Sequence, residues 1–157
     1  MEIRFAVPAD APTLLRFIRE LAAYEREPDA VEVTAETLAR QLGEAHAPFE
    51  CLLADVDGET VGFALFFHTY STWRGTRGLW LEDLFVTPSA RKRGVGGRLL
   101  KECARVARTR ECARFEWAVL DWNELAKGFY EGLGALPLEE WTRWRLDGEA
   151  LLRLSAD

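Results

Sequence analysis

The sequence predicts an α/β domain built on a mixed, largely antiparallel β-sheet. Segments of helical periodicity alternate with short runs rich in aliphatic and aromatic residues, which is typical of strands and helices packed together. Two of these runs are joined by Asp57-Gly58, a pair typical of a two-residue hairpin. The inferred order is β-α-α-β-β-β-α-β-α-β-β. With 157 residues, we expect a single domain over 1–157.

Composition limits the possible functions. The chain is 48% hydrophobic and 29% charged, and its formal net charge is −6, which disfavours nucleic acid and anionic membranes as partners. No apolar run approaches the ~18 residues of a membrane span, and the first residues show no signal-peptide pattern, so we expect a cytoplasmic protein. Cys51, Cys103 and Cys112 are odd in number and match no zinc spacing, so no metal is expected.

The first third predicts one strand and two helices. Ile3 to Val7 alternates as a strand that Pro8 ends, and Asp10 is the expected N-cap of the first helix. Thr34 is the expected N-cap of a second helix that runs through Leu42. The first helix carries apolar residues at i, i+3, i+4 and i+7, namely Leu14, Phe17, Ile18 and Leu21, and should end by Pro28. Tyr24, Glu25 and Glu27 lie together at its end, where they either line a substrate site or form a solvated turn.

The middle of the chain predicts the centre of the sheet. Phe49 to Val56 and Val61 to Tyr70 read as the two strands of the hairpin. The following loop contains Trp73, which either covers the site as a lid or fills a hydrophobic gap. Leu79 to Val86 reads as the next strand, which ends at Thr87-Pro88 because proline cannot donate to a ladder.

A basic, glycine-rich turn follows this strand and leads into a helix. Bare backbone N–H groups at such a turn, together with the helix dipole, favour an anion. Three basic side chains beside it favour a polyanion, most simply a pyrophosphate. The alternative is an ordinary strand-to-helix connection with solubilising arginines. The turn comprises Arg91, Lys92, Arg93, Gly94, Val95, Gly96 and Gly97.

The last quarter predicts short elements. Arg114 to Leu120 reads as a strand, and Asn123 as the N-cap of a helix over Glu124 to Leu133. Gly134 is a suitable residue just past that helix. Ala135 to Asp147 is expected to hold two further short strands, and Glu149 to Leu154 a tail helix.

The glycine-rich turn matches no common nucleotide motif, neither the Walker loop nor the dinucleotide fingerprint. Its spacing, Arg91-x-x-Gly94-x-Gly96 after a strand, instead resembles the acetyl-CoA signature of the Gcn5-related N-acetyltransferases (GNAT). This resemblance implies a GNAT-type sheet, mostly antiparallel and flanked by helices, with a splayed strand pair for acetyl-CoA.

Further segments resemble the diamine (spermidine/spermine) N-acetyltransferase family and its thialysine-type branch. They cover nearly the whole chain and comprise 21–25, 69–73, 81–86, Leu120-Asp121-Trp122-Asn123, Phe129-Tyr130 and Gly134-Ala135. The resemblance implies that pantetheine lies between the strands of Leu84 to Val86 and of Phe115 to Val119. It also implies a homodimer.

The resemblance further implies roles for single residues. Leu84 and Val86, with Phe85 between them, would give backbone contacts to the cofactor, and residues 91–97 would hold the pyrophosphate. Asn123, Ala126 and Tyr130 would lie near the thiol, where Tyr130 would protonate the departing thiolate. The family's basic residue two positions later is Gly132 here, a departure that removes one cofactor contact.

The chemistry of acetyl transfer to an amine supports such roles. A primary amine of pKa ~10.4 is only about 0.04% neutral at pH 7, which costs roughly 4–5 kcal/mol unless the site removes the proton. Glu82 is the candidate base, directly or through a water, or else it anchors a turn or a dimer contact. Tyr130, protonated at neutral pH, is the candidate acid, or else a core residue. Neighbouring strand residues face opposite sides, so Glu82 and Asp83 share one site only if a bulge lies there. The resemblance to the acetyltransferases implies such a bulge.

An acidic set would suit an extended diamine or a lysine-like side chain. Glu116, between Phe115 and Trp117, should face away from them, and Asp121 either binds substrate or caps a turn. We therefore predict acetyl-CoA-dependent acetylation of a small cationic amine. The alternatives are a non-catalytic acyl-CoA sensor and a protein lysine or N-terminal acetyltransferase. The candidate substrate-binding residues are Tyr24, Glu25, Trp73, Glu82, Asp83, Glu116 and Asp121.

Overall fold

The computed structural model describes residues 1–156 and contains two compact units. The first spans Met1–Ala118 and holds the whole sheet, and the second begins at Val119. The single domain expected over 1–157 therefore stays a prediction. No helix within residues 1–156 has the length and apolar content that crossing a bilayer requires.

The sheet has five strands in the order β1-β2-β3-β4-β5. Neighbours pair antiparallel from β1 to β4, and β5 runs parallel to β4, which confirms the mixed, mostly antiparallel sheet. The Asp57-Gly58 hairpin is also confirmed, because both residues take the left-handed backbone that a tight two-residue turn needs, with φ of 54° and 84°. The strands are β1 (Glu2–Phe5), β2 (Glu50–Val56), β3 (Glu59–Ser71), β4 (Thr76–Val86) and β5 (Phe115–Trp117).

The helices begin largely where their capping residues predict. Thr34 accepts a hydrogen bond from the Thr37 N–H at 3.1 Å, and Asn123 accepts one from Ala126 at 3.2 Å, so both expected caps are confirmed. Short 3₁₀ turns start at Pro8, Pro28 and Pro88. The helices are α1 (Ala11–Tyr24), α2 (Ala35–Leu42), α3 (Val95–Thr109), α4 (Glu124–Glu131) and α5 (Gly148–Ser155).

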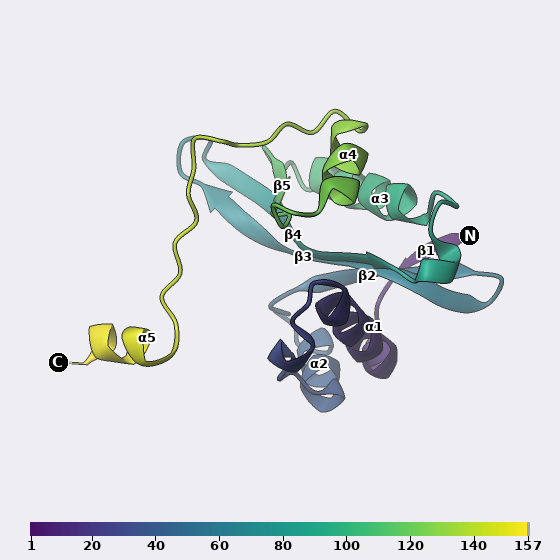
Figure 1. The fold of residues 1–157 in the computed structure, drawn as a ribbon, viewed down its shortest axis with the longest axis horizontal. Helices are drawn as coiled ribbons and strands as arrows, with labels where there is room; N and C mark the ends of the chain where they lie inside the picture. The colour runs from purple at the N-terminus through teal and green to yellow at the C-terminus, as the bar shows by residue number, and fades with distance from the viewer. Residues whose placement is uncertain (157) are drawn as a thin grey trace. The chain divides into compact units, whose positions relative to one another are not determined.

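In the first unit, α1 and α2 cover one face of the sheet and α3 covers the other (Figure 1). On the α1 face, Phe17 stacks on Phe63 of β3 with ring centroids 5.8 Å apart. Phe85 of β4 closes the same cluster. The α3 face buries the alternate strand residues, among them Phe66 and Leu81. The sheet is therefore covered on both sides.

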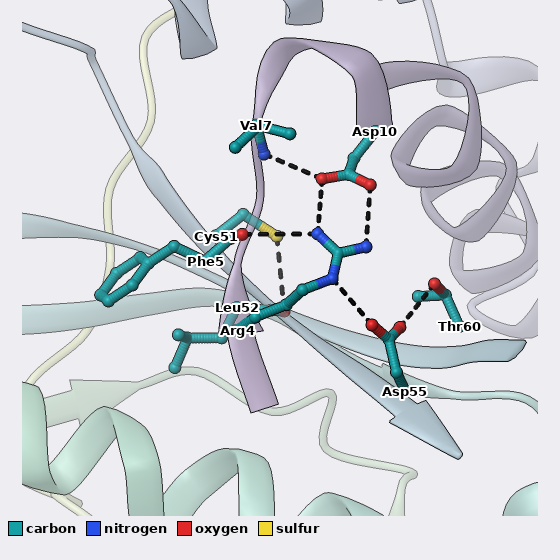
Figure 2. A network of polar contacts seen from close by, with 8 residues as sticks. All are labelled: Arg4, Phe5, Val7, Asp10, Cys51, Leu52, Asp55 and Thr60. Carbon is teal, nitrogen blue, oxygen red and sulfur yellow. Dashed lines mark hydrogen bonds and ion pairs between the residues drawn. The ribbon is translucent and has the colours of Figure 1, made fainter. Parts of the chain in front are cut away.

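Arg4 of β1 forms the centre of an ionic network at one edge of the sheet (Figure 2). Its guanidinium donates to Asp10 at 2.7 and 2.9 Å and to Asp55 at 2.7 Å, and the hydroxyl of Thr60 donates to Asp55 at 2.6 Å. Asp10 also accepts from the N–H of Val7 at 2.9 Å. Asp10 stands at the expected position before α1, but the prediction that its side chain caps this helix is wrong, because the network occupies its carboxylate.

The largest correction concerns the end of the chain. No strand forms between residues 135 and 147, although two were predicted there. A strand needs a neighbour for its backbone groups, and the side chains of Trp141 and Trp144 are 72% and 92% exposed instead of packed. Several predicted bounds also move. Thr76 rather than residue 79 begins β4, only Phe115–Trp117 of the next predicted strand pairs, and α4 ends at Glu131 instead of Leu133.

Candidate functional site

A β-bulge at Glu82 interrupts the regular pairing of β4. Leu65 of β3 lies opposite Asp83, whereas the next residue, Phe66, lies opposite Leu81, so Glu82 has no partner on β3. Such an extra residue resets the alternation of side chains. The bulge that the resemblance implied is therefore present at the expected residues.

The bulge places two adjacent carboxylates on one face of the sheet. Asp83 shares the face of Leu65, which belongs to the core under α1 and α2. Glu82 lies on that face too, because the indole Nε1–H of Trp80, two residues earlier, donates to its Oε2 at 2.7 Å. We call Glu25, Glu82 and Asp83 the acidic cluster, since Glu25 at the end of α1 acts electrostatically on Asp83.

Asp83 is the most perturbed carboxyl group of the cluster. Burial, followed by repulsion from Glu82 and Glu25, raises its pKa to about 7. Burial also raises the pKa of Glu25. Within residues 1–156, neither a hydrogen-bond donor nor a basic side chain neutralises the Asp83 carboxylate. The cluster therefore holds negative charge that an incoming cation would stabilise.

Glu116 lies on the same face but in a different electrostatic setting. In the parallel register it stands opposite Trp80, while Phe115 and Trp117 stand opposite Leu79 and Leu81, which agrees with the predicted facing. Its carboxylate forms an ion pair with Arg114 at 2.8 Å. Glu116 is thus already paired, unlike Asp83.

One edge of β4 is open beyond the bulge. β5 pairs only with Leu79, Trp80 and Leu81, so the rest of β4, up to Val86, has no partner on that side. The N–H of Leu79 donates to the carbonyl of Arg114 at 3.0 Å, whereas the N–H of Thr87 donates to the carbonyl of Val61, in β3, at 2.9 Å. Because backbone directions alternate along a strand, Leu84 and Val86 direct their polar groups to the open edge. This geometry matches the splayed strand pair that the resemblance implied.

The basic turn leads into α3 through Gly94. Gly94 has a φ of 79°, which favours glycine, and it offers no side chain to cap the helix. The first helical hydrogen bond is donated by Arg98 to Gly94 O at 3.0 Å, so the N–H groups of residues 95 to 97 precede the helical ladder. Gly96 and Gly97 therefore belong to the first turn of α3 instead of the preceding loop. The arrangement is suited to an anion.

Arg91 links this turn to the end of α1. Its Nε donates to Val86 O at 2.9 Å, and its guanidinium lies 5.2 Å from the ring of Tyr24 and 5.6 Å from that of Phe85. Stacking and the hydrogen bond fix the guanidinium at the open edge of β4. The other two basic residues of the turn, Lys92 and Arg93, are exposed, and Arg93 lies 3.9 Å from Asp57.

Trp73 lies at the far end of β4 from this turn. It is 89% exposed, in the connection between β3 and β4, and the strand from Thr76 to Glu82 separates it from the acidic cluster. At about 3.3 Å per residue, this separation is roughly 20 Å. The structure does not bring Trp73 to Glu82, and its role as a lid stays a prediction.

The second unit carries the remaining predicted residues. Ala126 and Tyr130 lie on α4, which Asn123 caps, and the ring of Tyr130 is 5.3 Å from that of Phe129. The backbone carbonyl of Asp121 accepts a hydrogen bond from Lys127. Helix α4 therefore presents Tyr130 from its last turn, with part of the residue accessible to solvent.

Sequence reasoning missed the role of Trp80 and the unequal surroundings of the two carboxylates. An aromatic N–H two residues before a carboxylate on a strand is a usable signal, because such residues share a face. The burial of Asp83 could not be found in this way.

A surface pocket of about 230 Å³, lined by residues such as Phe49, Phe67 and His68, includes none of the predicted site residues. Among residues 1–156 there is no group of three or more potential metal ligands.

The chain is similar to several known acetyltransferases. A sequence model of the acetyltransferase (GNAT) family matches residues 14–135. A thialysine N-epsilon-acetyltransferase of Bos taurus is 41% identical over an alignment of 165 positions, which covers 98% of this chain and 96% of that protein. Spermidine/spermine N(1)-acetyltransferase-like protein 1 of Homo sapiens is 37% identical, over 98% of this chain and 24% of that protein. An integron cassette protein structure from V. cholerae superposes with a TM-score of 0.83 at 27% identity, covering 99% of this chain and 98% of the other.

The raised pKa of Asp83 predicts a pH-dependent gain of stability in Asp83→Asn. Ionised Asp83 destabilises the folded state. This destabilisation is absent below pH ~4, grows as the pH rises and reaches its full size above pH ~7. The free energy of unfolding of the variant should therefore exceed that of the wild type by on the order of 3 kcal/mol at pH 8 and equal it at pH 4. Urea unfolding at both pH values measures this, with Asp29→Asn, an exposed site, as control. An equal effect at both pH values would contradict it.

Proposed function

Because the chain belongs to the acetyltransferase (GNAT) family, we propose that it acetylates a primary amine of a small cationic substrate, a diamine or polyamine or a thialysine-like amino acid. The enzyme class follows from the family, whose acetyl donor is acetyl-CoA. The observation that carries the choice of acceptor is the acidic cluster, which lies on the strand with the open edge.

The residues of the first unit fit acetyl-CoA. The open edge of β4 offers the backbone groups of Leu84 and Val86 to the amides of pantetheine, as an added strand would. The start of α3 and the three basic residues of 91–93 suit the pyrophosphate. Arg91 donates to Val86 O through Nε, which leaves its terminal nitrogens for the phosphate oxygens.

The acidic cluster suits a cationic acceptor. Glu25, Glu82 and Asp83 are close enough for their repulsion to raise the pKa of Asp83, and an ammonium group would relieve this repulsion. Relatives named for thialysine and for spermidine/spermine support an amine of this kind. Substrates with a second positive charge should therefore be preferred over neutral amines.

The reaction needs two proton transfers. The substrate ammonium first gives a proton to a carboxylate of the cluster, with Glu82 as the proposed acceptor, directly or through a water. The neutral nitrogen then attacks the acetyl carbon, the C–S bond breaks, and the departing thiolate takes a proton from the hydroxyl of Tyr130. The second proton of the former ammonium group restores the Tyr130 hydroxyl as the amide forms, and Glu82 releases the first proton to solvent, so the products are acetylated amine, free CoA and one proton.

An amine panel with Glu82→Gln tests this proposal. Free-thiol release from acetyl-CoA should rise well above the no-amine background for a diamine, spermidine, spermine, lysine or thialysine. Glu82→Gln should lower kcat by about 10²–10³-fold, because general base catalysis is lost, while acetyl-CoA affinity stays within about twofold.

The control for this test is direct acetyl-CoA binding by calorimetry, in both proteins. An equal loss of binding and turnover would make Glu82 structural. A panel in which only a lysine peptide reacts would overturn the small-amine acceptor. A flat panel in which acetyl-CoA still binds would favour a non-catalytic acyl-CoA sensor.

Tyr130→Phe tests the proposed acid. The variant keeps the ring that packs beside Phe129 and removes only the hydroxyl, so it should fold. We expect the rate of the chemical step to fall by about 10²-fold, because the thiolate leaves without its proton donor. Single-turnover acetylation under saturating acetyl-CoA measures that step. Wild-type rates would remove Tyr130 from the mechanism.

We also propose that the protein forms a homodimer through the end of its chain. Residues 136–154 hold large apolar side chains that are mostly exposed, and a contiguous set of this kind is typical of a protein interface. The predicted strands of 135–147 would then find their partner in a second copy. The exposed residues include Leu136, Leu138, Trp141, Trp144, Leu151, Leu152 and Leu154.

A paired substitution tests the dimer. Trp141→Glu with Trp144→Glu places two charges in the exposed segment, where neither side chain supports the core of the first unit. Sedimentation equilibrium should show twice the mass of 17.8 kDa for the wild type and the monomer mass for the variant. A monomeric wild type at all concentrations would contradict the proposal.

A further inference from the structure

The side chain of Trp80 on β4 contacts a proposed catalytic group. Its indole Nε1–H lies 2.7 Å from Oε2 of Glu82. Trp80 and Glu82 share a face because alternate side chains of a strand point to the same side. On the adjoining strands, Phe67 of β3 and Glu116 of β5 stand opposite Trp80 in the register of the sheet.

This hydrogen bond makes the two adjacent carboxylates unequal. A donor to a carboxylate favours its ionised form, and Glu82 has such a donor. Within residues 1–156 Asp83 has none, and it is more deeply buried.

We propose that Trp80 is a positioning residue for acetyl transfer, one whose indole N–H holds and aims the Glu82 carboxylate as the proton acceptor. The inference rests on the proposed function, in which Glu82 takes the proton of the substrate ammonium. It assigns the two carboxylates different tasks: Glu82 is the acceptor, and Asp83 adjusts the charge of the cluster.

The groups that face the pair support this division. From α1 comes Glu25, whose charge disfavours ionised Asp83, and from β2 the buried thiol of Cys51 faces Asp83. From β5 comes Glu116, whose charge Arg114 neutralises. Binding of an ammonium group should therefore release a proton from Asp83 near neutral pH, because the added positive charge favours the ionised form.

A double-mutant cycle tests the proposal. Trp80→Phe keeps an aromatic ring and removes the donor, and it is made in the wild type and in Glu82→Gln. In the wild type, kcat/KM for the best amine should fall about tenfold at pH 6.5, and the acid limb of its pH profile should move about one unit upward. In the Glu82→Gln background, Trp80→Phe should lower kcat/KM by less than about twofold.

Phe67→Leu serves as the matched control, because it changes the packing beside Trp80 and leaves the N–H in place. Phe67→Leu should lower kcat/KM by the same factor in the wild type and in Glu82→Gln, and it should not shift the pH profile. If Trp80→Phe is equally costly in both backgrounds, or leaves the profile unmoved, Trp80 is structural and the proposal fails.

A second measurement requires neither turnover nor an active Trp80 variant. The indole ¹H–¹⁵N resonance of Trp80, assigned by its loss in Trp80→Phe, should move with pH between 5 and 8 in the wild type. In Glu82→Gln this movement should largely disappear. A resonance that ignores pH, or that moves equally in Glu82→Gln, overturns the inference. If no amine is acetylated while the resonance behaves as expected, the proposed function fails and the Trp80–Glu82 coupling stands.

Discussion

The extra residue in β4 at Glu82 is the constraint on which the site depends. Before the bulge, the backbone groups of Leu79 point to β5, and after it those of Leu84 and Val86 point to the same edge of the strand, where β5 no longer pairs. One inserted residue therefore changes both what the strand presents at its edge and which side chains share a face. It brings Glu82 and Asp83 together and opens the edge beside them. Without it, one of the two carboxylates would lie in the core under α3.

Charge is organised along β4 in two regions of opposite sign. The basic turn and the start of α3 follow the end of the strand, while the acidic cluster lies at its middle. A polyanionic donor and a cationic acceptor can thus be bound near one strand. The arrangement has a cost in stability, because like charges in this partly buried cluster destabilise the folded state until a cation binds. The Arg4 network lies at the opposite edge of the sheet, where both of its carboxylates are paired and their pKa values are lowered.

Local interactions explain why much of this could be predicted. The helical repeat of α1, the Asp57-Gly58 turn and the Thr34 and Asn123 caps each depend on residues within a few positions of one another. Such features are decided by backbone geometry and periodicity. The basic turn belongs with them, since Gly94 alone supplies the backbone conformation that begins α3. The resemblance then supplied the bulge and the open strand edge that local patterns cannot give.

The sequence by itself therefore determined the elements, their order up to α4, and the residue types gathered around β4. Only the tertiary structure decided how far each carboxyl group is buried and which donor it meets. The carboxylate of Asp10 binds Arg4 instead of capping its helix. The indole of Trp80 donates a hydrogen bond to Glu82, whereas Asp83 has no such donor among the described residues. Residues 135–147 have the composition of strands but no neighbour with which to pair. The physical reason is the same in each case, because burial and pairing depend on segments far apart in the chain, which no local pattern records.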